Sequence, residues 1–163
     1  MTASPAWHDY IGRPWINGEN DCWTLVRDIY RDHLGIDLPA IVIDAENLRQ
    51  VLQAFEDPAN LSPWQRIPAP QHLCLVFFTP GHHRATHCGL WLDISGGRFL
   101  HCHRRAGVVL EDRITLELNG WCNPRFYRHA SCDKTAVFTS GGDGHVQANS
   151  GDDGGGLGSG VFS

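Results

Sequence analysis

One cysteine lies where a helix is expected to begin, a position that changes the chemistry of a thiol. Residues 18–34 read Gly-Glu-Asn-Asp-Cys-Trp-Thr-Leu-Val-Arg-Asp-Ile-Tyr-Arg-Asp-His-Leu, with apolar residues at helical spacing after Cys22. Asn20 or Asp21 supplies the N-cap, and Gly35 fits the C-cap. Free N–H groups and the helix dipole favour an anion in the first turn, which can lower a thiol pKa to roughly 3.5–7.5. Cys22 is therefore a candidate nucleophile, the alternative being a small buried apolar residue.

Two histidines lie on strands that are expected to be neighbours. His87 is near the start of one apolar extended run and His101 near the end of the next, with a Ser-Gly-Gly turn at 95–97 between them. Alternation along the strands puts both imidazoles on one face of the sheet and Cys88 and Cys102 on the opposite face. We expect the histidine face to pack against the start of the first helix.

With that packing, three side chains supply what acyl transfer by a thiol requires. Cys22 attacks a carbonyl carbon, His87 holds the thiolate as an ion pair and protonates the leaving amine, and His101 orients His87. Backbone N–H groups at the start of the helix, including that of Cys22, are expected to hold the oxyanion. The other histidines are expected at the surface or in turns: His8, His33, His72, His82, His83, His103, His129 and His145.

The elements that position these residues are expected to be helices followed by strands. A second helix is predicted after Asp44 as N-cap, with apolar residues at 48, 51, 52 and 55, and a proline-rich loop follows residue 57. Extended runs are predicted at 73–78, 86–93, 98–102, 108–111 and 126–128, and a short segment of unassigned type at 114–118. Helices first and an antiparallel meander afterwards indicate an α+β fold.

The composition divides the chain into one domain and a tail. Its 163 residues, 42% of them hydrophobic, suffice for one domain with a proper core, which we expect at residues 1–130. Residues 131–163 are rich in glycine, serine and aspartate, and from 139 onward contain almost nothing apolar before Val161. Such a segment buries too little surface to fold alone, so we expect it to be flexible or ordered by a partner.

Charge, hydropathy and cysteine spacing exclude several classes of function. A net charge of −5 without a basic run argues against nucleic acid as a partner. No apolar stretch approaches 18 residues and the first residues lack a signal region, so we expect no membrane span and synthesis in the cytoplasm. None of the six cysteines forms a Cys-x-x-Cys pair, so the common structural zinc site is not indicated.

Taken in order, the motifs resemble the NlpC/P60 papain-like cysteine peptidases, most closely the branch found in phage tails. The matching blocks lie at 10–14, 18–30, 34–39, 75–78, 87–92, 99–101, 107–109 and 126–128, within residues 7–129. The resemblance implies a triad of Cys22, His87 and His101, without metal or cofactor. It also implies a papain-like α+β fold in which N-terminal helices pack on an antiparallel sheet of about five strands.

The same resemblance implies a substrate and a place of action. The substrate is the peptide stem of bacterial peptidoglycan, typically cut at a D-γ-glutamyl–diamino-acid bond, with Tyr10, Asp21 and Trp23 expected to bind it. The place is the tail tip of a virion assembled in the host cytoplasm, with other tail-tip proteins as partners, through the C-terminal tail among other contacts. The chain departs from the family at 71–72, where Gln-His replaces the usual Gly-Asp, and at Cys88, usually an apolar or small residue.

Three alternatives remain open at this point. The first is a zinc site formed by Cys22, His87 and His101, or by His101 and His103 with one of the histidines at 82–83. The second is a mainly structural protein of the tail tip, with latent or no activity. The third, a free secreted wall hydrolase, is disfavoured because the sequence shows neither an export signal nor a wall-binding repeat.

Overall fold

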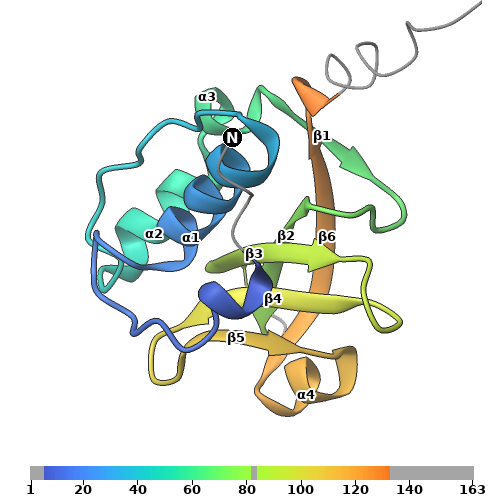
Figure 1. Cartoon of the computed structure of the whole chain (residues 1–163). Helices are drawn as coiled ribbons and strands as arrows, with labels where there is room; N and C mark the ends of the chain where they lie inside the picture. The colour runs from blue at the N-terminus through green and yellow to red at the C-terminus, as the bar shows by residue number, and fades with distance from the viewer. Residues whose placement is uncertain (1–5, 82–83, 133–163) are drawn as a thin grey trace, which may run out of the picture.

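The computed structural model describes residues 6–81 and 84–132, in which α-helices pack against an antiparallel sheet, three of them on one face and the last, shortly before the C-terminal strand, on the other (Figure 1). Within these residues there are four α-helices and one six-stranded antiparallel sheet with strand order β1-β6-β2-β3-β4-β5. The helices are α1 (Cys22–Ile29), α2 (Leu48–Glu56), α3 (Pro58–Leu61) and α4 (Arg113–Leu118), with a short 3-10 turn at Trp7–Asp9. The strands are β1 (Trp64–Ile67), β2 (Cys74–Pro80), β3 (His87–Leu92), β4 (Arg98–His103), β5 (Gly107–Glu111) and β6 (Trp121–His129).

Helix α1 begins at Cys22 because the residue before it caps the first turn. The Asp21 carboxylate accepts hydrogen bonds from the backbone N–H groups of Trp23 (3.0 Å) and Thr24 (2.9 Å). The Thr24 hydroxyl in turn accepts from the N–H of Asp21 at 2.6 Å, completing a capping box. Of the two expected N-caps, Asp21 is therefore the one used, and the helix begins where the sequence predicted. A π-helical turn at Tyr30–Leu34 follows, and Gly35 ends it in the left-handed conformation (φ 65°).

Helix α2 lies where the apolar spacing predicted a helix, although Leu48 is 61% exposed and the cap differs from the predicted one. The Asn47 side chain accepts from the N–H groups of Arg49 and Gln50, which makes Asn47 the N-cap. Asp44, the expected cap, lies three residues earlier in a turn, where its carboxylate accepts from Asn17 Nδ2 (2.8 Å) and from a backbone N–H. Both residue types cap helices well, so their order alone did not decide between them.

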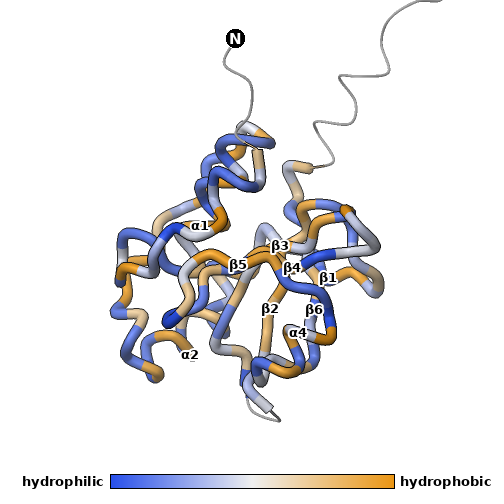
Figure 2. Tube along the Cα trace, turned by 60° about the horizontal axis from the view of Figure 1, so that its bottom comes forward, coloured by the Kyte–Doolittle hydropathy of each residue, from blue (hydrophilic) through white to orange (hydrophobic). Residues whose placement is uncertain are grey.

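The sheet has six strands where about five were expected. The addition is β1, which pairs with β6 from Trp64 opposite His129 to Ile67 opposite Phe126. Prolines on both sides favour a loop there, but an edge strand tolerates such neighbours. The segment at 114–118 is helix α4, capped by Asp112, whose carboxylate accepts from the N–H of Thr115 at 2.8 Å. The other predicted strands are present, and the central strand β2 is apolar along most of its length (Figure 2).

Helix α1 packs on the opposite face of the sheet from the one expected. Cys88 and Cys102 belong to the core cluster that contains the buried face of α1, formed by Leu25, Val26 and Ile29. His87 and His101 instead contact Phe78, which belongs to the cluster on the other face. The prediction that the histidine face packs on the helix is therefore wrong. The physical reason is that the cysteine face carries more buried apolar strand residues, whereas the other face also carries the two imidazoles.

The last element of the described residues is strand β6. Strand β6 ends at His129, and 133–163, most of the expected tail, lies outside the described residues. His129 is buried against Trp64, with ring centroids 4.8 Å apart, so its expected place at the surface is wrong. Of the helices in the part that the structure describes, none has the length and apolar character to cross a membrane.

The cap of α1 makes a first prediction. Asp21→Ala should lower the free energy of unfolding by about 1 kcal/mol, because two backbone N–H groups lose their acceptor. Asp21→Asn should change it little, since asparagine caps equally well. Asp37→Ala, at an exposed carboxylate after the same helix, is the control. Urea unfolding followed by circular dichroism measures all three, and equal stabilities of the Asp21→Ala and Asp37→Ala variants would contradict the assignment.

Candidate active site

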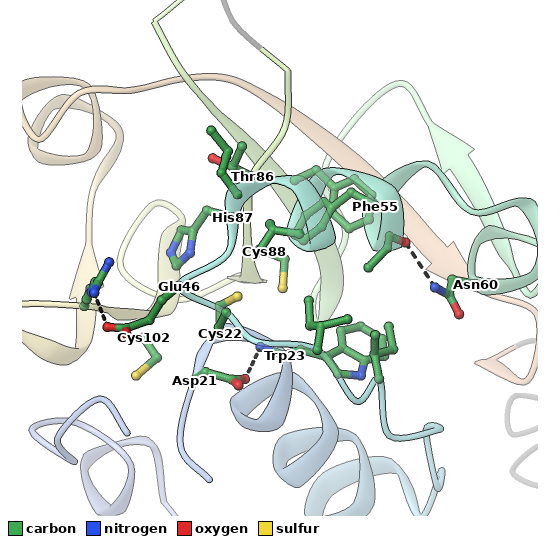
Figure 3. A pocket seen from close by; sticks show the side chains of 18 of the residues that line it. Asp21, Cys22, Trp23, Glu46, Phe55, Asn60, Thr86, His87, Cys88 and Cys102 are labelled. Atoms are coloured by element: carbon green, nitrogen blue, oxygen red, sulfur yellow. Dashed lines mark hydrogen bonds and ion pairs between the residues drawn. The ribbon is translucent and has the colours of Figure 1, made fainter. Parts of the chain in front are cut away.

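A cavity of about 340 Å³ lies beside the first turn of α1. Its wall is mostly apolar, and Figure 3 shows the side chains of Cys22, His87 and Cys88 converging on one part of it. The polar part of the rim includes Glu46, which forms an ion pair with Arg104. The cavity therefore places a potential nucleophile in contact with a space large enough for part of a ligand.

Cys22 is partly exposed, and its surroundings favour the thiolate. Its pKa lies well below the ordinary value, mainly because the Cys88 thiol donates a hydrogen bond to it, and further because His87 hydrogen-bonds to it and favours the anion electrostatically. Burial and the Asp21 carboxylate oppose this shift. The pKa of Cys88 is raised well above its ordinary value, because it shares that hydrogen bond and is buried. Cys22 is therefore the thiolate of the pair, and Cys88 the neutral donor.

His87 is held between two aromatic rings and a second histidine. Its Nε2 lies 2.9 Å from Nδ1 of His101. The Trp121 indole stacks on its ring with centroids 4.5 Å apart and planes 23° from parallel, and Phe78 lies 5.5 Å away on centroids. The residue is 6% exposed, and these contacts restrict rotation of its imidazole.

His101 lies behind His87, away from the cavity. It is 1% exposed, and this burial lowers its pKa to about 4. Its Nε2 lies 3.0 Å from Oε2 of Glu111, whose pKa is lowered chiefly by that hydrogen bond. The imidazole of His101 is therefore neutral near pH 7, and it links His87 to a carboxylate.

The contact between the histidines requires a glycine on β3. A Cβ at Gly89 would lie 2.6 Å from the carbonyl oxygen of Leu100 and 2.7 Å from Cβ of His101, closer than atoms can approach. Gly89 thus allows β3 and β4 to come together where the two imidazoles meet.

The three residues expected to bind substrate have different positions. Asp21 lines the cavity, although its carboxylate is engaged as the helix cap. Trp23 also lines the cavity, and its Nε1 donates to the carbonyl of Pro39 at 3.0 Å. Tyr10 has no exposed surface, and its hydroxyl donates to Asp32 Oδ2 at 2.8 Å. The prediction that Tyr10 contacts substrate is therefore wrong, because its large ring fills the core instead.

The helix cap leaves fewer backbone N–H groups free to hold an oxyanion than the sequence suggested. Because Asp21 accepts from the N–H groups of Trp23 and Thr24, these two are not free for a substrate oxygen. The N–H of Leu25 donates to the carbonyl of Asp21. The N–H of Cys22 is thus the first-turn donor left to hold an oxyanion.

Sequence reasoning missed several side chains around the site. Cys88, Trp121 and Glu111 each touch one of the three expected residues. The signal for Glu111 was partial: it ends the extended run predicted at 108–111, and the structure adds the register that pairs it with Phe99, two residues from His101 on the same face. Cys88 was placed on the correct face, but the helix was expected on the other. No sequence signal pointed to Trp121, which comes from β6, far along the chain.

The remaining histidines mostly lie as expected. His8 and His72 are exposed and His33 is partly buried under Trp7, whereas His103 lines the cavity. The histidines at 82, 83 and 145 lie outside the described residues. Across 6–81 and 84–132, no group of three or more His, Cys, Asp or Glu side chains is arranged to hold a metal ion.

The Cys88 thiol makes a second prediction. Cys88→Ala removes the hydrogen bond that contributes most to the low pKa of Cys22, so that pKa should rise. Alkylation of Cys22 by iodoacetamide should slow at pH 6, where less thiolate is present, and recover at high pH. Cys74→Ala, a buried cysteine on the other face, is the matched control. Peptide mass spectrometry gives the rates, and an unchanged pH profile for Cys88→Ala would refute the assignment.

Comparison with known protein families finds no family model that matches this chain, and comparison with curated proteins finds no match either.

Proposed function

We propose that this protein is a cysteine peptidase that cleaves the peptide stems of bacterial peptidoglycan. One observation carries the proposal: Cys22 starts a helix beside His87, and His87 is joined through His101 to a carboxylate. A thiolate, a base and a group that orients the base are the requirements of covalent acyl transfer. The motif resemblance to the NlpC/P60 peptidases, with their papain-like fold, supports the choice of substrate.

The reaction follows from these contacts. The Cys22 thiolate attacks the carbonyl carbon, and the resulting oxyanion accepts from the N–H of Cys22. Protonated His87 gives its proton to the leaving amine, which departs as the C–N bond breaks and leaves a thioester on Cys22. Neutral His87 then takes a proton from water, which attacks the thioester and releases the acyl fragment as a carboxylic acid. His87 finally returns to the protonated partner of the thiolate.

The cavity wall offers two kinds of surface to a peptide stem. Near Cys22 it is apolar, with Trp23, Phe55 and Trp64 among the lining residues, and suits the aliphatic parts of the stem. The Arg104 guanidinium lies at the polar part of the rim, paired with Glu46 and 5.4 Å from the Trp15 ring centroid. In this proposal Arg104 pairs with a carboxylate of the stem.

We place the enzyme at the tail tip of a phage, where local cleavage of the wall aids delivery of the genome. This location follows from the phage-tail branch that the motifs resemble. Other tail-tip proteins would be its partners, in part through residues 131–163. The alternative is a mainly structural tail-tip protein, for which loss of the Cys22 thiol should not impair infection.

The nucleophile makes a third prediction. Cys22→Ser should lower hydrolysis of purified peptidoglycan by several orders of magnitude, as removal of a triad member usually does. The free energy of unfolding should change by no more than about 1 kcal/mol, since the substitution is nearly isosteric. Cys122→Ser, at a partly exposed cysteine in β6, is the matched control. Release of stem fragments, measured by chromatography and mass spectrometry, gives the rates.

Assembly and infection separate this proposal from the structural alternative. Particles carrying Cys22→Ser should assemble but enter walled cells poorly. Normal infection by these particles, together with no cleavage of any wall fragment by the parent protein, would replace the peptidase proposal with the structural one.

A further inference from the structure

We infer that Glu111 is a positioning residue that acts through His101 to keep a proton on Nε2 of His87, leaving Nδ1 of His87 as the basic atom toward Cys22. The inference rests on the proposed function and adds a fourth member to the expected triad. It assigns Glu111 no contact with substrate. Three observations carry it: the contacts of the carboxylate, the burial of the two imidazoles, and the order of donors and acceptors along the chain.

The Glu111 carboxylate is fixed by a partner on each oxygen. Oε2 lies 3.0 Å from Nε2 of His101, and Oε1 accepts from Nδ2 of Asn119 at 2.6 Å. Glu111 is the last residue of β5 and Asn119 is the C-cap of α4, so the end of the helix fixes the carboxylate at the end of the strand. The side chain is only 11% exposed, which limits competition from water for either bond.

Donor and acceptor capacity then fixes each proton in the chain. An ionised carboxylate only accepts, so Nε2 of His101 must carry a proton and donate it. His101 is neutral near pH 7 because of its burial, so its Nδ1 is bare and accepts. Across the 2.9 Å contact, Nε2 of His87 must therefore be the donor.

The consequence for His87 is a single permitted tautomer. With its one proton on Nε2, neutral His87 has a bare Nδ1 that can accept the thiol proton of Cys22. When that proton arrives, the imidazolium keeps its bond to His101 and forms the ion pair with the thiolate. The nearby negative charge of Glu111 further stabilises this buried cation, because charges interact strongly where water is excluded.

A neutral amide at position 111 would allow the opposite order of hydrogen-bond donors and acceptors along the chain of imidazoles. The glutamine amide of Glu111→Gln can donate to Nε2 of His101, which moves the His101 proton to Nδ1. That proton would then point at Nε2 of His87, which must accept, and neutral His87 would carry its proton on Nδ1. The base would be in the wrong tautomer, and the imidazolium would meet a donor where it needs an acceptor.

The substrate-free experiment measures alkylation of Cys22 by iodoacetamide against pH in the full chain. Glu111→Gln should slow the reaction at pH 6 by about tenfold or more, since one pKa unit corresponds to a tenfold change in thiolate at low pH. The loss should shrink as pH rises. Glu117→Gln, an exposed carboxylate paired with Arg113, is the matched control and should match the parent. Asn119→Ala, which removes the second contact of Glu111 but leaves His101 in place, should have a smaller effect than Glu111→Gln.

A second readout is independent of whether the variants fold. Nitrogen-15 NMR of histidine-labelled parent protein reports the tautomer of each ring. Protonated Nε2 and bare Nδ1 in neutral His87, with the same arrangement in His101, is the expected result. A proton on Nδ1 of neutral His87, or an unchanged pH profile in folded Glu111→Gln, would overturn the inference. If the parent alkylates like an ordinary thiol while the tautomers are as expected, the proposed function fails and the assignment of Glu111 stands.

Discussion

The 2.9 Å contact between His87 and His101 is the interaction on which the arrangement of the site depends. It needs two strands in register, a hairpin of fixed length between them, and Gly89 where a side chain would force them apart. It also needs a dry environment, since an exposed imidazole would exchange its partner for water. The sheet supplies this environment from the face opposite the helix, through Phe78 and Trp121. This one hydrogen bond therefore depends on residues of four strands, β2, β3, β4 and β6.

The thiol and the base come from opposite sides of the sheet and meet at its end. His87 is the first residue of β3 and Cys22 is the first residue of α1. Helix α1 packs on the face that carries Cys88 and Cys102, and its first turn lies next to Cys88. An imidazole at the first position of a strand can reach the cavity beyond the sheet, which one in the middle could not. Cys88 therefore packs in the core and also contacts the nucleophile, Cys22.

Local patterns predicted the elements well, because they depend on neighbours in sequence. The start of α1 at Cys22, the apolar period of α2 and the hairpin that pairs the two histidine strands all followed from spacing and turn residues. The same patterns could not decide which sheet face the helix covers, since both faces alternate equally well. The deciding property is the total apolar surface of each face, and the structure shows the larger buried apolar cluster on the cysteine face.

Long-range contacts were the harder part of the site. Tyr10 is aromatic and near the nucleophile in sequence, yet its ring fills the core and its hydroxyl reaches Asp32. Glu111 and Trp121 arrive from later strands, so their contacts depend on register and on the return of β6 beside β2. The periodicity of apolar residues predicts which side of a segment is buried. It does not predict which distant segment packs against that side.

The most direct test of the account is a search for the covalent intermediate. The full chain would be mixed with stem peptides from peptidoglycan, quenched with acid within the first turnovers, digested and analysed by mass spectrometry. The account predicts a thioester on the peptide containing Cys22, with a mass increment equal to the acyl part of the stem, that disappears on longer incubation. Cleavage of the stem without any adduct on Cys22, or an adduct on a different residue, would contradict it.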